Sequence, residues 1–382
     1  MEYVRLKDIG QIITGNTPPT SKPEYYGDYM PFIKATDIPI GVKCTLVTEQ
    51  SYSKLAAEKY KKSLVPKGST CVVTIGSIGK KMTYAHTDLF VNQAINAIVP
   101  KDSYDNEYIF YNVRCSVLPQ LKKLDSGTTS GRENISKTSF SSIRIPVIKD
   151  KNVQRRIGVI LSTYDSLIEN NTKRIRLLEK MAENLYKEWF VRFRFSGHEK
   201  VEMENGLPKG WKVKRYEEEL NVKYGKGLPT NRLTEDGFPV FGSNGQIGFY
   251  TSYMYDTPQI LISCRGASSG VVNISLPKSF VTNNSLVCEL TDKTESVFEY
   301  LKYYFLNTNL VQYQTGSAQP QITINNVVKL KMLVPSHEVQ CAFSKKIRVI
   351  DKEVANLQNQ NSLLARQRDL LLPRLMSGKL EI

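Results

Sequence analysis

The sequence is poor in the residues from which metal centres and disulfide frameworks are built. Its 382 residues include three histidines, far apart in the chain, and six cysteines that form no CxxC pair. Most of the cysteines lie in apolar runs of strand-like or helical character, so we expect buried thiols rather than disulfides or zinc ligands. A metal centre has little to build on. The residues concerned are His86, His198 and His337, and Cys44, Cys71, Cys115, Cys264, Cys288 and Cys341.

Long apolar runs are also absent. A membrane-spanning helix needs about eighteen or more consecutive apolar residues, and the sequence has no such run, although 41% of its residues are hydrophobic. The segment Met1–Gly10 lacks the charged-then-apolar pattern of a secretory signal. We therefore expect a cytoplasmic protein without a membrane span.

Motifs of DNA-modifying and nucleotide-using enzymes are missing as well. An adenine methyltransferase needs Asn or Asp followed by two prolines and an aromatic residue, whereas the nearest string, Asn16-Thr17-Pro18-Pro19, has another spacing and no aromatic residue after it. The string 76–81, GSIGKK, lacks the glycine spacing and the final Ser or Thr of a phosphate-binding loop. No His–carboxylate spacing suggests metal-assisted hydrolysis. These absences favour a binding subunit over a catalyst.

Positive charge, in contrast, is abundant. Lys and Arg number 52 against 37 Asp and Glu, which gives a formal net charge of +15 and a pI near 9.3. The basic residues are spread over both halves of the chain. This balance fits a polyanionic partner, most simply nucleic acid. The alternative is a soluble basic protein without such a partner.

The clearest periodic signal is a heptad seam between Val153 and Trp189, in which apolar residues and one Asn recur in steps of four and three. Adding 186 to each position gives a second seam near the C-terminus. Two helices of roughly 35 residues, each about 50 Å long, would most economically bury these seams against each other; the alternative is two unrelated amphipathic helices on separate domains. The seams are Ile157, Leu161, Tyr164, Ile168, Asn171, Ile175, Leu178, Ala182, Leu185 and Trp189, and Phe343, Ile347, Ile350, Val354, Leu357, Asn361, Leu364, Arg368, Leu371 and Leu375.

The rest of the chain repeats one plan. Copy one begins near Tyr3 and reaches Gly15, and copy two begins near Trp211 and reaches Gly225, an offset of 210. In each copy a β-branched run, 70–75 or 259–265, leads into a Gly/Ser turn, and a second strand follows at 94–99 or 285–290. The chain is therefore expected to fold as two similar domains.

Each copy continues with a tyrosine-rich helix, at about 106–124 and 295–313, a Gly-led polar loop, and a last strand that ends at a proline before a long helix. The offset shrinks to about 190 in the middle, so copy one has roughly twenty extra residues between Gly15 and Gly76. We interpret the polar stretch Phe195–Leu207, between the copies, as a linker.

This plan resembles the specificity subunit of type I restriction-modification systems over nearly its full length. Three strings carry the likeness: GLPKGW at 206–211, which enters the second copy, WFVRF at 189–193, which ends the central helix, and LLPRLMSGKL at 371–380. Each is short, but their order and distances are specific. Arg192 stands where the family often has an Asp, and we attach no functional consequence to it.

The resemblance implies two target-recognition domains that each bind one half of a split DNA site, with the helices holding them apart. It also implies that two methyltransferase subunits, which use S-adenosylmethionine, dock on these helices, that a motor-nuclease subunit can join, and that this chain catalyses nothing and holds no cofactor itself. We expect an α+β fold of two mixed α/β domains and two long antiparallel coiled-coil helices related by a pseudo-twofold repeat. The predicted parts are domain 1 (1–150), the central spacer helix (151–196), the linker and domain 2 (197–336) and the C-terminal spacer helix (337–382).

Two other functions compete with this one. A free-standing DNA-binding regulator explains the charge and the duplication, but it does not explain why the helices keep apolar residues outside the seam. These residues, which suggest a partner, are Ile160, Leu167, Leu177, Tyr186 and Phe190. A purely structural coiled-coil protein explains the helices but not two basic domains with Gly-, Asn- and Thr-rich loops.

DNA contacts are expected from the loops that follow the strands. Arg and Lys can bind phosphate or guanine, and Asn or Gln can pair with an adenine edge. Several neighbouring glycines are expected to be turn residues only. The candidates are Ser77, Lys80, Lys81, Thr128, Thr129 and Arg132 in domain 1, and Asn244, Arg265, Ser268, Gln319 and Gln321 in domain 2.

The polar seam residues predict how the helices pair. In an antiparallel pair, Asn171 can face Asn361, while Leu161 faces Leu371, Trp189 faces Phe343 and Arg368 falls beside the ring of Tyr164. The alternative is that both asparagines point to solvent. The residues expected to pair are Tyr164, Ile168, Asn171, Ile175, Leu178, Val354, Leu357, Asn361 and Leu364.

Overall fold

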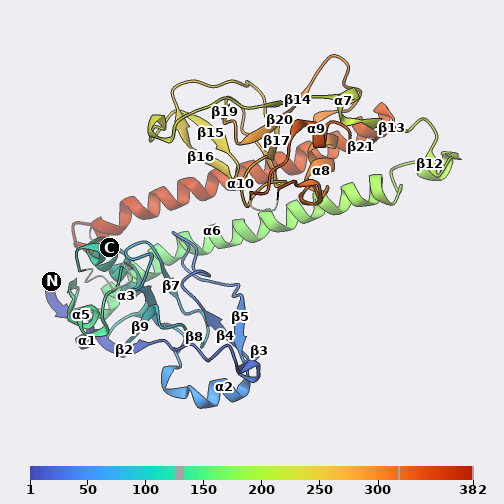
Figure 1. Ribbon diagram of the computed structural model, residues 1–382. Coiled ribbons are helices and arrows are strands. Elements are labelled where there is room, and N and C mark those ends of the chain that lie inside the picture. The colour runs from blue at the N-terminus through green and yellow to red at the C-terminus, as the bar shows by residue number, and fades with distance from the viewer. Residues whose placement is uncertain (125–132, 317–318, 381–382) are drawn as a thin grey trace. The chain divides into compact units, whose positions relative to one another are not determined.

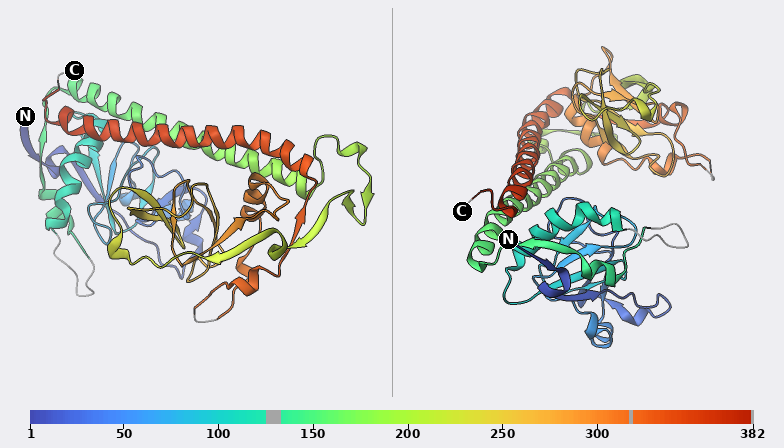
Figure 2. Two further views of the ribbon diagram at one scale, coloured as in Figure 1. Left: turned by 90° about the horizontal axis from the view of Figure 1, so that it is seen from above. Right: turned by 90° about the vertical axis from the view of Figure 1, so that its left-hand side faces the viewer.

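The computed structural model describes residues 1–124, 133–316 and 319–380, and it divides into two compact units. Unit 1 consists of Met1–Lys173 and Leu357–Ile382, and unit 2 of Arg174–Asn356. Each unit contains one copy of the repeat and a segment of each long helix (Figure 1). Both ends of the chain belong to unit 1 (Figure 2). Over the described ranges, no helix has the length and apolar character to cross a membrane.

Unit 1 is built around an antiparallel sheet of strand order β2-β9-β6-β7. A second sheet has the order β3-β5-β4-β8, with β4 parallel to β8, and β1 pairs with β10. Val72 of β6 and Ile98 of β9 share a buried cluster with Tyr108 of α3. The strands are β1 (Glu2–Arg5), β2 (Gly10–Thr14), β3 (Tyr26–Gly27), β4 (Met30–Ile33), β5 (Gln50–Tyr52), β6 (Thr70–Val73), β7 (Met82–Tyr84), β8 (Phe90–Val91), β9 (Ile95–Pro100) and β10 (Arg144–Val147); the helices are α1 (Leu6–Ile9), α2 (Lys54–Lys59), α3 (Asn106–Asn112), α4 (Leu118–Leu121) and α5 (Lys137–Ser142).

Unit 2 repeats this arrangement, which confirms the internal repeat. Its sheet order β14-β20-β17-β18 matches that of unit 1, β15 is parallel to β19, and β13 pairs with β21. Helix α2 of unit 1 lies in the extra residues of copy one. The elements are β13 (Lys212–Arg215), α7 (Tyr216–Glu219), β14 (Leu220–Tyr224), β15 (Phe238–Gly242), β16 (Gly245–Tyr250), β17 (Ile260–Ser263), β18 (Val272–Ile274), β19 (Phe280–Val281), β20 (Ser285–Leu290), α8 (Phe298–Leu306), α9 (Ile324–Val327) and β21 (Lys331–Val334).

The first strand of each sheet is followed directly by a glycine for a steric reason. A Cβ atom on Gly15 would lie 2.1 Å from the Val91 carbonyl oxygen, and one on Gly225 would lie 2.4 Å from that of Val281. Any side chain would therefore force the neighbouring strand away. This shared constraint explains why both copies have glycine directly after the first strand.

The long helices are α6 (Lys151–Tyr186), which continues into a π-helical turn at Lys187–Val191, and α10 (His337–Met376). In unit 1, Leu161 of α6 shares a buried core with Leu375 of α10. In unit 2, Trp189 lies 5.9 Å from Phe343 between ring centroids. Within each unit the start of one helix packs on the end of the other, so the predicted antiparallel pairing is confirmed.

The hydrogen bonds of the polar seam residues confirm the register of this helix pairing to within one residue. The two asparagines, however, do not bond to each other as predicted. The side-chain amide of Asn171 donates to Gln360, and that of Asn361 donates to Thr172, each at 3.4 Å. Each asparagine thus bonds to the sequence neighbour of the residue that we expected it to meet. Within the described residues the Asn361 amide oxygen has no hydrogen-bond partner, so this layer of the seam is incompletely satisfied and costs stability.

The prediction for Arg368 is wrong. Its guanidinium forms a buried ion pair with Asp165, one residue beyond Tyr164. A hydrogen-bonded carboxylate attracts a buried cation more strongly than the face of a tyrosine ring does. The heptad spacing alone overlooked Asp165 because that residue is adjacent to the apolar seam.

The prediction that Tyr186 and Phe190 belong to a partner surface on the helices is also wrong. Tyr186 and Phe190 are only 6% and 3% exposed, because they pack in the core of unit 2 against Tyr300 and Phe343. Their apolar character reflects contact with the domain of their own unit. Leu167 and Leu177 do remain exposed, at 46% and 71%, and Ile160 is half-buried.

Two local boundaries differ from the sequence prediction. Helix α8 ends at Leu306, because the side chains of Asn307 and Thr308 donate to the carbonyls of the preceding turn at 2.8 and 2.7 Å. The stretch that we interpreted as a linker is folded. It contains the paired strands β11 (Met203–Glu204) and β12 (Leu207–Pro208), and Phe195 stacks on Trp211 with ring centroids 5.4 Å apart. All six cysteines are free thiols; three are buried and three half-buried.

Candidate nucleic-acid interface

The buried strands β6 and β17 each lead into a turn bounded by two glycines. We call residues 75–79 the first strand-end turn and residues 265–270 the second. Gly76, Gly79, Gly266 and Gly270 all have positive φ, between 71° and 87°. A side chain is strained in this conformation. The glycines are therefore turn residues, as expected. Between them, Ser77 and Ala267 are exposed and Ser268 is half-buried, whereas Ile78 and Ser269 are buried.

A second segment returns beside each turn in the same way. The backbone of Ile75 forms an antiparallel bridge with Asn134, and that of Arg265 forms one with Gln321. The N–H of Gly76 donates to the Glu133 carbonyl at 3.0 Å, and the N–H of Gly266 donates to the Pro320 carbonyl at 3.1 Å. Each unit thus presents a surface made from a strand-end turn and a returning segment, residues 133–134 in unit 1 and 320–321 in unit 2.

In unit 2 the structure brings the predicted residues together at the end of β17. Arg265, Gln319 and Gln321 are exposed and Ser268 is half-buried. Asn244 is exposed in the β15–β16 hairpin, whose Ser243 carbonyl accepts a hydrogen bond from Ser263, the last residue of β17. Three segments distant in sequence therefore meet around one strand end, with one guanidinium and several amides available to a ligand.

In unit 1 the predicted residues are brought together less fully. Ser77 and Lys80 are exposed on or beside the first strand-end turn. Lys81 is half-buried, and its ammonium donates to the Ala35 carbonyl at 3.0 Å, so part of its hydrogen-bonding capacity is used within the unit. The remaining candidates, Thr128, Thr129 and Arg132, lie outside the described residues.

Sequence reasoning missed Asn134, which occupies in unit 1 the position that Gln321 occupies in unit 2. Aligning Ile135 with Ile322 would have found it, because their N–H groups donate to the equivalent carbonyls of Thr74 and Cys264. It also missed Gln314, whose amide donates to the Ser269 carbonyl at 2.5 Å and holds the second strand-end turn. Nothing in the local sequence marks that contact.

The exposed side chains of these surfaces are of kinds that bind nucleic acid. Burial raises the pKa of the Cys264 thiol beside Arg265, so the sulfur stays protonated and is a poor nucleophile. In the part of the chain that the structure describes, no cluster of three or more His, Cys, Asp or Glu residues could hold a metal ion. Arginine and amide side chains on a solvent-facing surface are the groups that hydrogen-bond phosphates and base edges.

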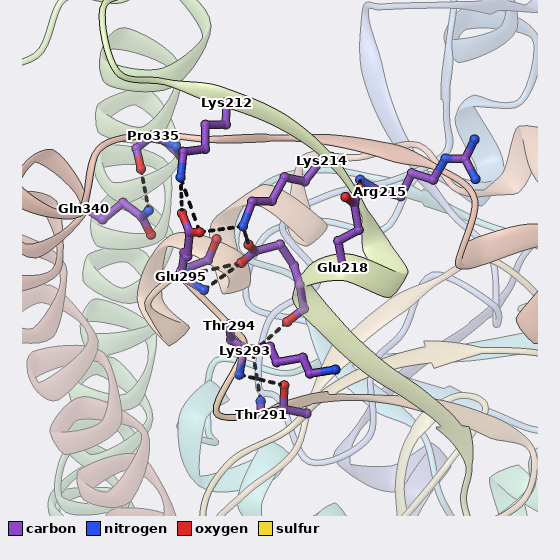
Figure 3. Close-up of polar contacts among 12 residues, drawn as sticks. Lys212, Lys214, Arg215, Glu218, Thr291, Lys293, Thr294, Glu295, Pro335 and Gln340 are labelled. Atoms are coloured by element: carbon purple, nitrogen blue, oxygen red, sulfur yellow. Dashed lines mark hydrogen bonds and ion pairs between the residues drawn. The ribbon is translucent and has the colours of Figure 1, made fainter.

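Where β14 begins and β20 ends, at the other end of the sheet from the second surface, a polar cluster holds β13 and α8 in place (Figure 3). The Glu219 side chain, 0% exposed, accepts hydrogen bonds from Lys214 at 2.7 Å and from the N–H groups of Glu295 and Ser296 at 3.0 and 3.1 Å. Lys214 also pairs with Glu295 at 2.8 Å. Hydrogen bonds from Lys214 and Lys212 hold the pKa of Glu295 below its usual value. The start of α8 is thereby fixed to the first strand of the unit.

A buried glutamine then joins each domain to its long helix. Gln340 in the first turn of α10 accepts from the Val297 N–H at 2.9 Å and donates to the Pro335 carbonyl at 2.8 Å. Gln154 in α6 accepts from the Asp105 N–H at 2.9 Å and donates to the Ile148 carbonyl at 2.6 Å. Both side chains are 0% exposed. The same fixed joint therefore occurs in both units.

Arg265 is the residue of the second surface whose replacement should be most informative. If its guanidinium reads a base, Arg265→Ala should weaken DNA binding by roughly 1–3 kcal/mol and relax specificity at one position. Arg265→Lys is the matched control, since Lys keeps the charge but loses the two-pronged hydrogen-bonding edge. Binding titrations against a set of single-base variants would give both quantities. Unchanged affinity and specificity in Arg265→Ala would remove this residue from the interface.

Comparison with known proteins adds independent findings. A family model for the type I restriction modification DNA specificity domain matches residues 1–180 and 208–365. The specificity subunit of type I restriction enzyme MjaIX from Methanocaldococcus jannaschii is 26% identical over 406 aligned positions, which cover 99% of this chain and 93% of that protein. The HindI specificity subunit from Haemophilus influenzae is 32% identical over 182 positions, covering 47% of this chain and 38% of that protein.

Among solved structures, the S subunit of a type I restriction-modification system from M. genitalium superposes with a TM-score of 0.59 at 19% identity. The match covers 98% of this chain and 95% of that chain. At this identity the likeness establishes the fold, and it confirms two mixed α/β domains with a long helix between them.

Proposed function

This chain belongs to the type I restriction modification DNA specificity family, and from that premise we propose that it is the DNA-recognition subunit of a type I complex. Each domain binds one half of a split DNA site through its strand-end turn and the adjoining loop. The chain itself catalyses nothing. S-adenosylmethionine is bound by the methyltransferase partner, and a motor-nuclease subunit can join the complex.

One observation carries this proposal: the two units have the same backbone arrangement at the strand-end turn, but the side chains on it differ. The Ile75–Asn134 and Arg265–Gln321 bridges lie at equivalent places in the two units. An apolar and an amide residue stand at one surface, and a cation and an amide residue at the other. Different side chains on the same frame give different base preferences, as a protein that reads two unlike half-sites requires.

Exposed leucines support two methyltransferase partners. Leu177 on α6 is 71% exposed and belongs to unit 2, and Leu363 on α10 is 51% exposed and belongs to unit 1. They are repeat equivalents, 186 residues apart. A partner that covers each helix at this position would bury these apolar side chains. The repeat supplies that surface twice, so the proposal assigns one partner to each.

Replacing these leucines tests the number of partners. Leu177→Asp and Leu363→Asp should each remove one methyltransferase copy from the complex, and the double variant should remove both. Losing a buried leucine costs about 1.5–3 kcal/mol, and placing a charge in the contact costs more, so each affinity should fall at least tenfold. Native mass spectrometry of the co-expressed complex gives the stoichiometry. Gln358→Asp, which adds the same charge on another face of α10, is the control.

DNA binding with and without the partner separates the competing functions. The complex should bind a site found by mapping methylated adenines in the host, whereas the chain alone should bind it weakly. A regulator would bind its site alone, and a structural coiled-coil protein would bind no DNA. Either of these results would replace the proposal.

A further inference from the structure

A buried charge network connects both long helices to the recognition domain of unit 1. The side chains of Asp165 in α6 and Arg368 in α10 are only 5% and 3% exposed, and they form an ion pair. The Tyr111 hydroxyl donates to the same carboxylate. Arg368 also donates to Asp369 at 3.0 Å, and Asp369 pairs with Arg114 at 3.2 Å. Contacts therefore run from the domain through α6 to α10.

Unit 2 has a related network at the equivalent place. Asp351 in α10 is the repeat equivalent of Asp165, 186 residues on. The Tyr303 hydroxyl donates to Asp351 at 3.0 Å, as that of Tyr111 does to Asp165. The cation, however, is Lys302 of α8, at 2.8 Å. In this unit the half-buried carboxylate and its cation join the domain to a single long helix.

The cation that pairs with the carboxylate comes from a different helix in each unit. Neither unit has a basic residue at the position that supplies the cation in the other unit. The repeat equivalent of Arg368 in α6 is Ala182, which is fully buried and has no charge. The equivalent of Lys302 in α3 is Phe110, which is 1% exposed. Unit 1 therefore depends on the opposite helix for its positive charge, whereas the domain of unit 2 supplies its own.

Burial makes the dependence stronger in unit 1. The Asp351 side chain is 30% exposed, so water can solvate it if Lys302 is removed, but Asp165 is 5% exposed. A buried carboxylate without a cation is strongly destabilised. Burial opposes the charge of Arg368, yet Asp369 and Asp165 raise its pKa above the ordinary value. Burial and the nearby Asp165 raise the pKa of Tyr111, which keeps its hydroxyl a donor.

We propose that Arg368 is a positioning residue through which the C-terminal helix holds the first recognition domain, so that reading of the first half-site depends on α10. Reading of the second half-site needs no such residue from α6, because Lys302 belongs to the second domain. This inference rests on the proposed function in assigning one half-site to each domain.

Four variants of the full chain separate positioning from stability. Arg368→Met leaves Asp165 buried without its cation. The double variant Asp165→Asn with Arg368→Met keeps an acceptor for Tyr111 but removes both charges, so it should be more stable than the single variant. Lys302→Met is the matched change in unit 2. Arg366→Met removes an exposed arginine of the same helix and controls for net charge.

The first readout is binding of the methyltransferase complex to DNA with either half-site altered. In Arg368→Met and in the double variant, discrimination against an altered first half-site should fall about tenfold or more, with the second half-site within about twofold of wild type. Lys302→Met and Arg366→Met should keep both. Equal losses at both half-sites, or none at the first in a folded double variant, would overturn the proposal.

The second readout needs no DNA. Amide hydrogen exchange of the free chain should become faster in α3 of Arg368→Met and of the double variant, while α8 stays at the wild-type rate. Unchanged exchange in α3 would overturn the coupling. If the wild-type complex bound no site specifically, the proposed function would fail by itself, and exchange in α3 would still decide whether α10 holds the first domain.

Discussion

Removing residues 357–382 is expected to unfold the recognition domain at the opposite end of the sequence. Leu372, Leu375 and Met376 are 6%, 1% and 3% exposed, and they share one buried cluster with strand β10 and helix α3 of unit 1. Burying each side chain contributes about 1.5–3 kcal/mol. Their joint loss, with that of Arg368, is comparable to the whole stability of a domain, about 5–15 kcal/mol.

The change should be confined to unit 1. Amides in β6 and β9 should lose their protection from hydrogen exchange in the 1–356 variant, while β17 and β20 keep theirs, because residues 174–356 are intact. Removal of residues 379–382 alone is the control, since Lys379 and Leu380 are exposed. Full protection of β6 and β9 in the 1–356 variant would mean that the end of α10 is dispensable for this core.

Glu219→Ala is expected to destabilise unit 2 by about 3–5 kcal/mol, the cost of breaking a buried ion pair. The substitution leaves Lys214, 18% exposed at its side chain, without its fully buried partner. It also leaves the N–H groups of Glu295 and Ser296 without an acceptor. Each unsatisfied buried group adds to the cost. The start of α8 should loosen first.

Urea denaturation followed by a probe in unit 2 would measure this loss. Glu218→Ala is the matched control on the same short helix. Among the described residues Glu218 accepts one hydrogen bond, from the exposed Arg215 N–H, so its loss should cost about 1 kcal/mol. Lys214→Val with Glu219→Ile introduces the residues found at the equivalent positions of copy one, Val4 and Ile9. This double variant should recover part of the stability. A Glu219→Ala protein as stable as wild type would show that the cluster is not needed.

Features with local or periodic causes could be predicted from the sequence. The alternation of four- and three-residue steps predicted both long helices, because the side chains on one helical face follow that spacing. The positions of Asn171 and Asn361 in the two seams predicted the antiparallel pairing. The Gly/Ser stretches after the buried runs predicted equivalent turns in both copies, because Gly76, Gly79, Gly266 and Gly270 adopt a positive φ that glycine favours. The structure also brings together Arg265 and Gln321, which the sequence analysis selected because both stand next to short buried runs; their contact with DNA stays a prediction.

Other features depend on which segments meet. The sequence pattern assigned Tyr186 and Phe190 to a partner surface, but the domain of their own unit covers them. The stretch 195–207 looked like a polar linker, although Phe195 finds a stacking partner in Trp211. Neither contact can be read from local composition, because the residue that buries each side chain lies elsewhere in the sequence.

By itself, then, the sequence determined that the chain consists of two copies of one domain and two helices that pair in antiparallel fashion. Only the tertiary structure decided where the buried charges find partners. Asp165 and Arg368 are 203 residues apart, and Asp351 has the same helical position as Asp165 but takes its cation from α8. Helical periodicity places a carboxylate on a face, but the cation that neutralises it is selected by packing between elements. As a result, the equivalent carboxylates of the two copies pair with cations from different elements.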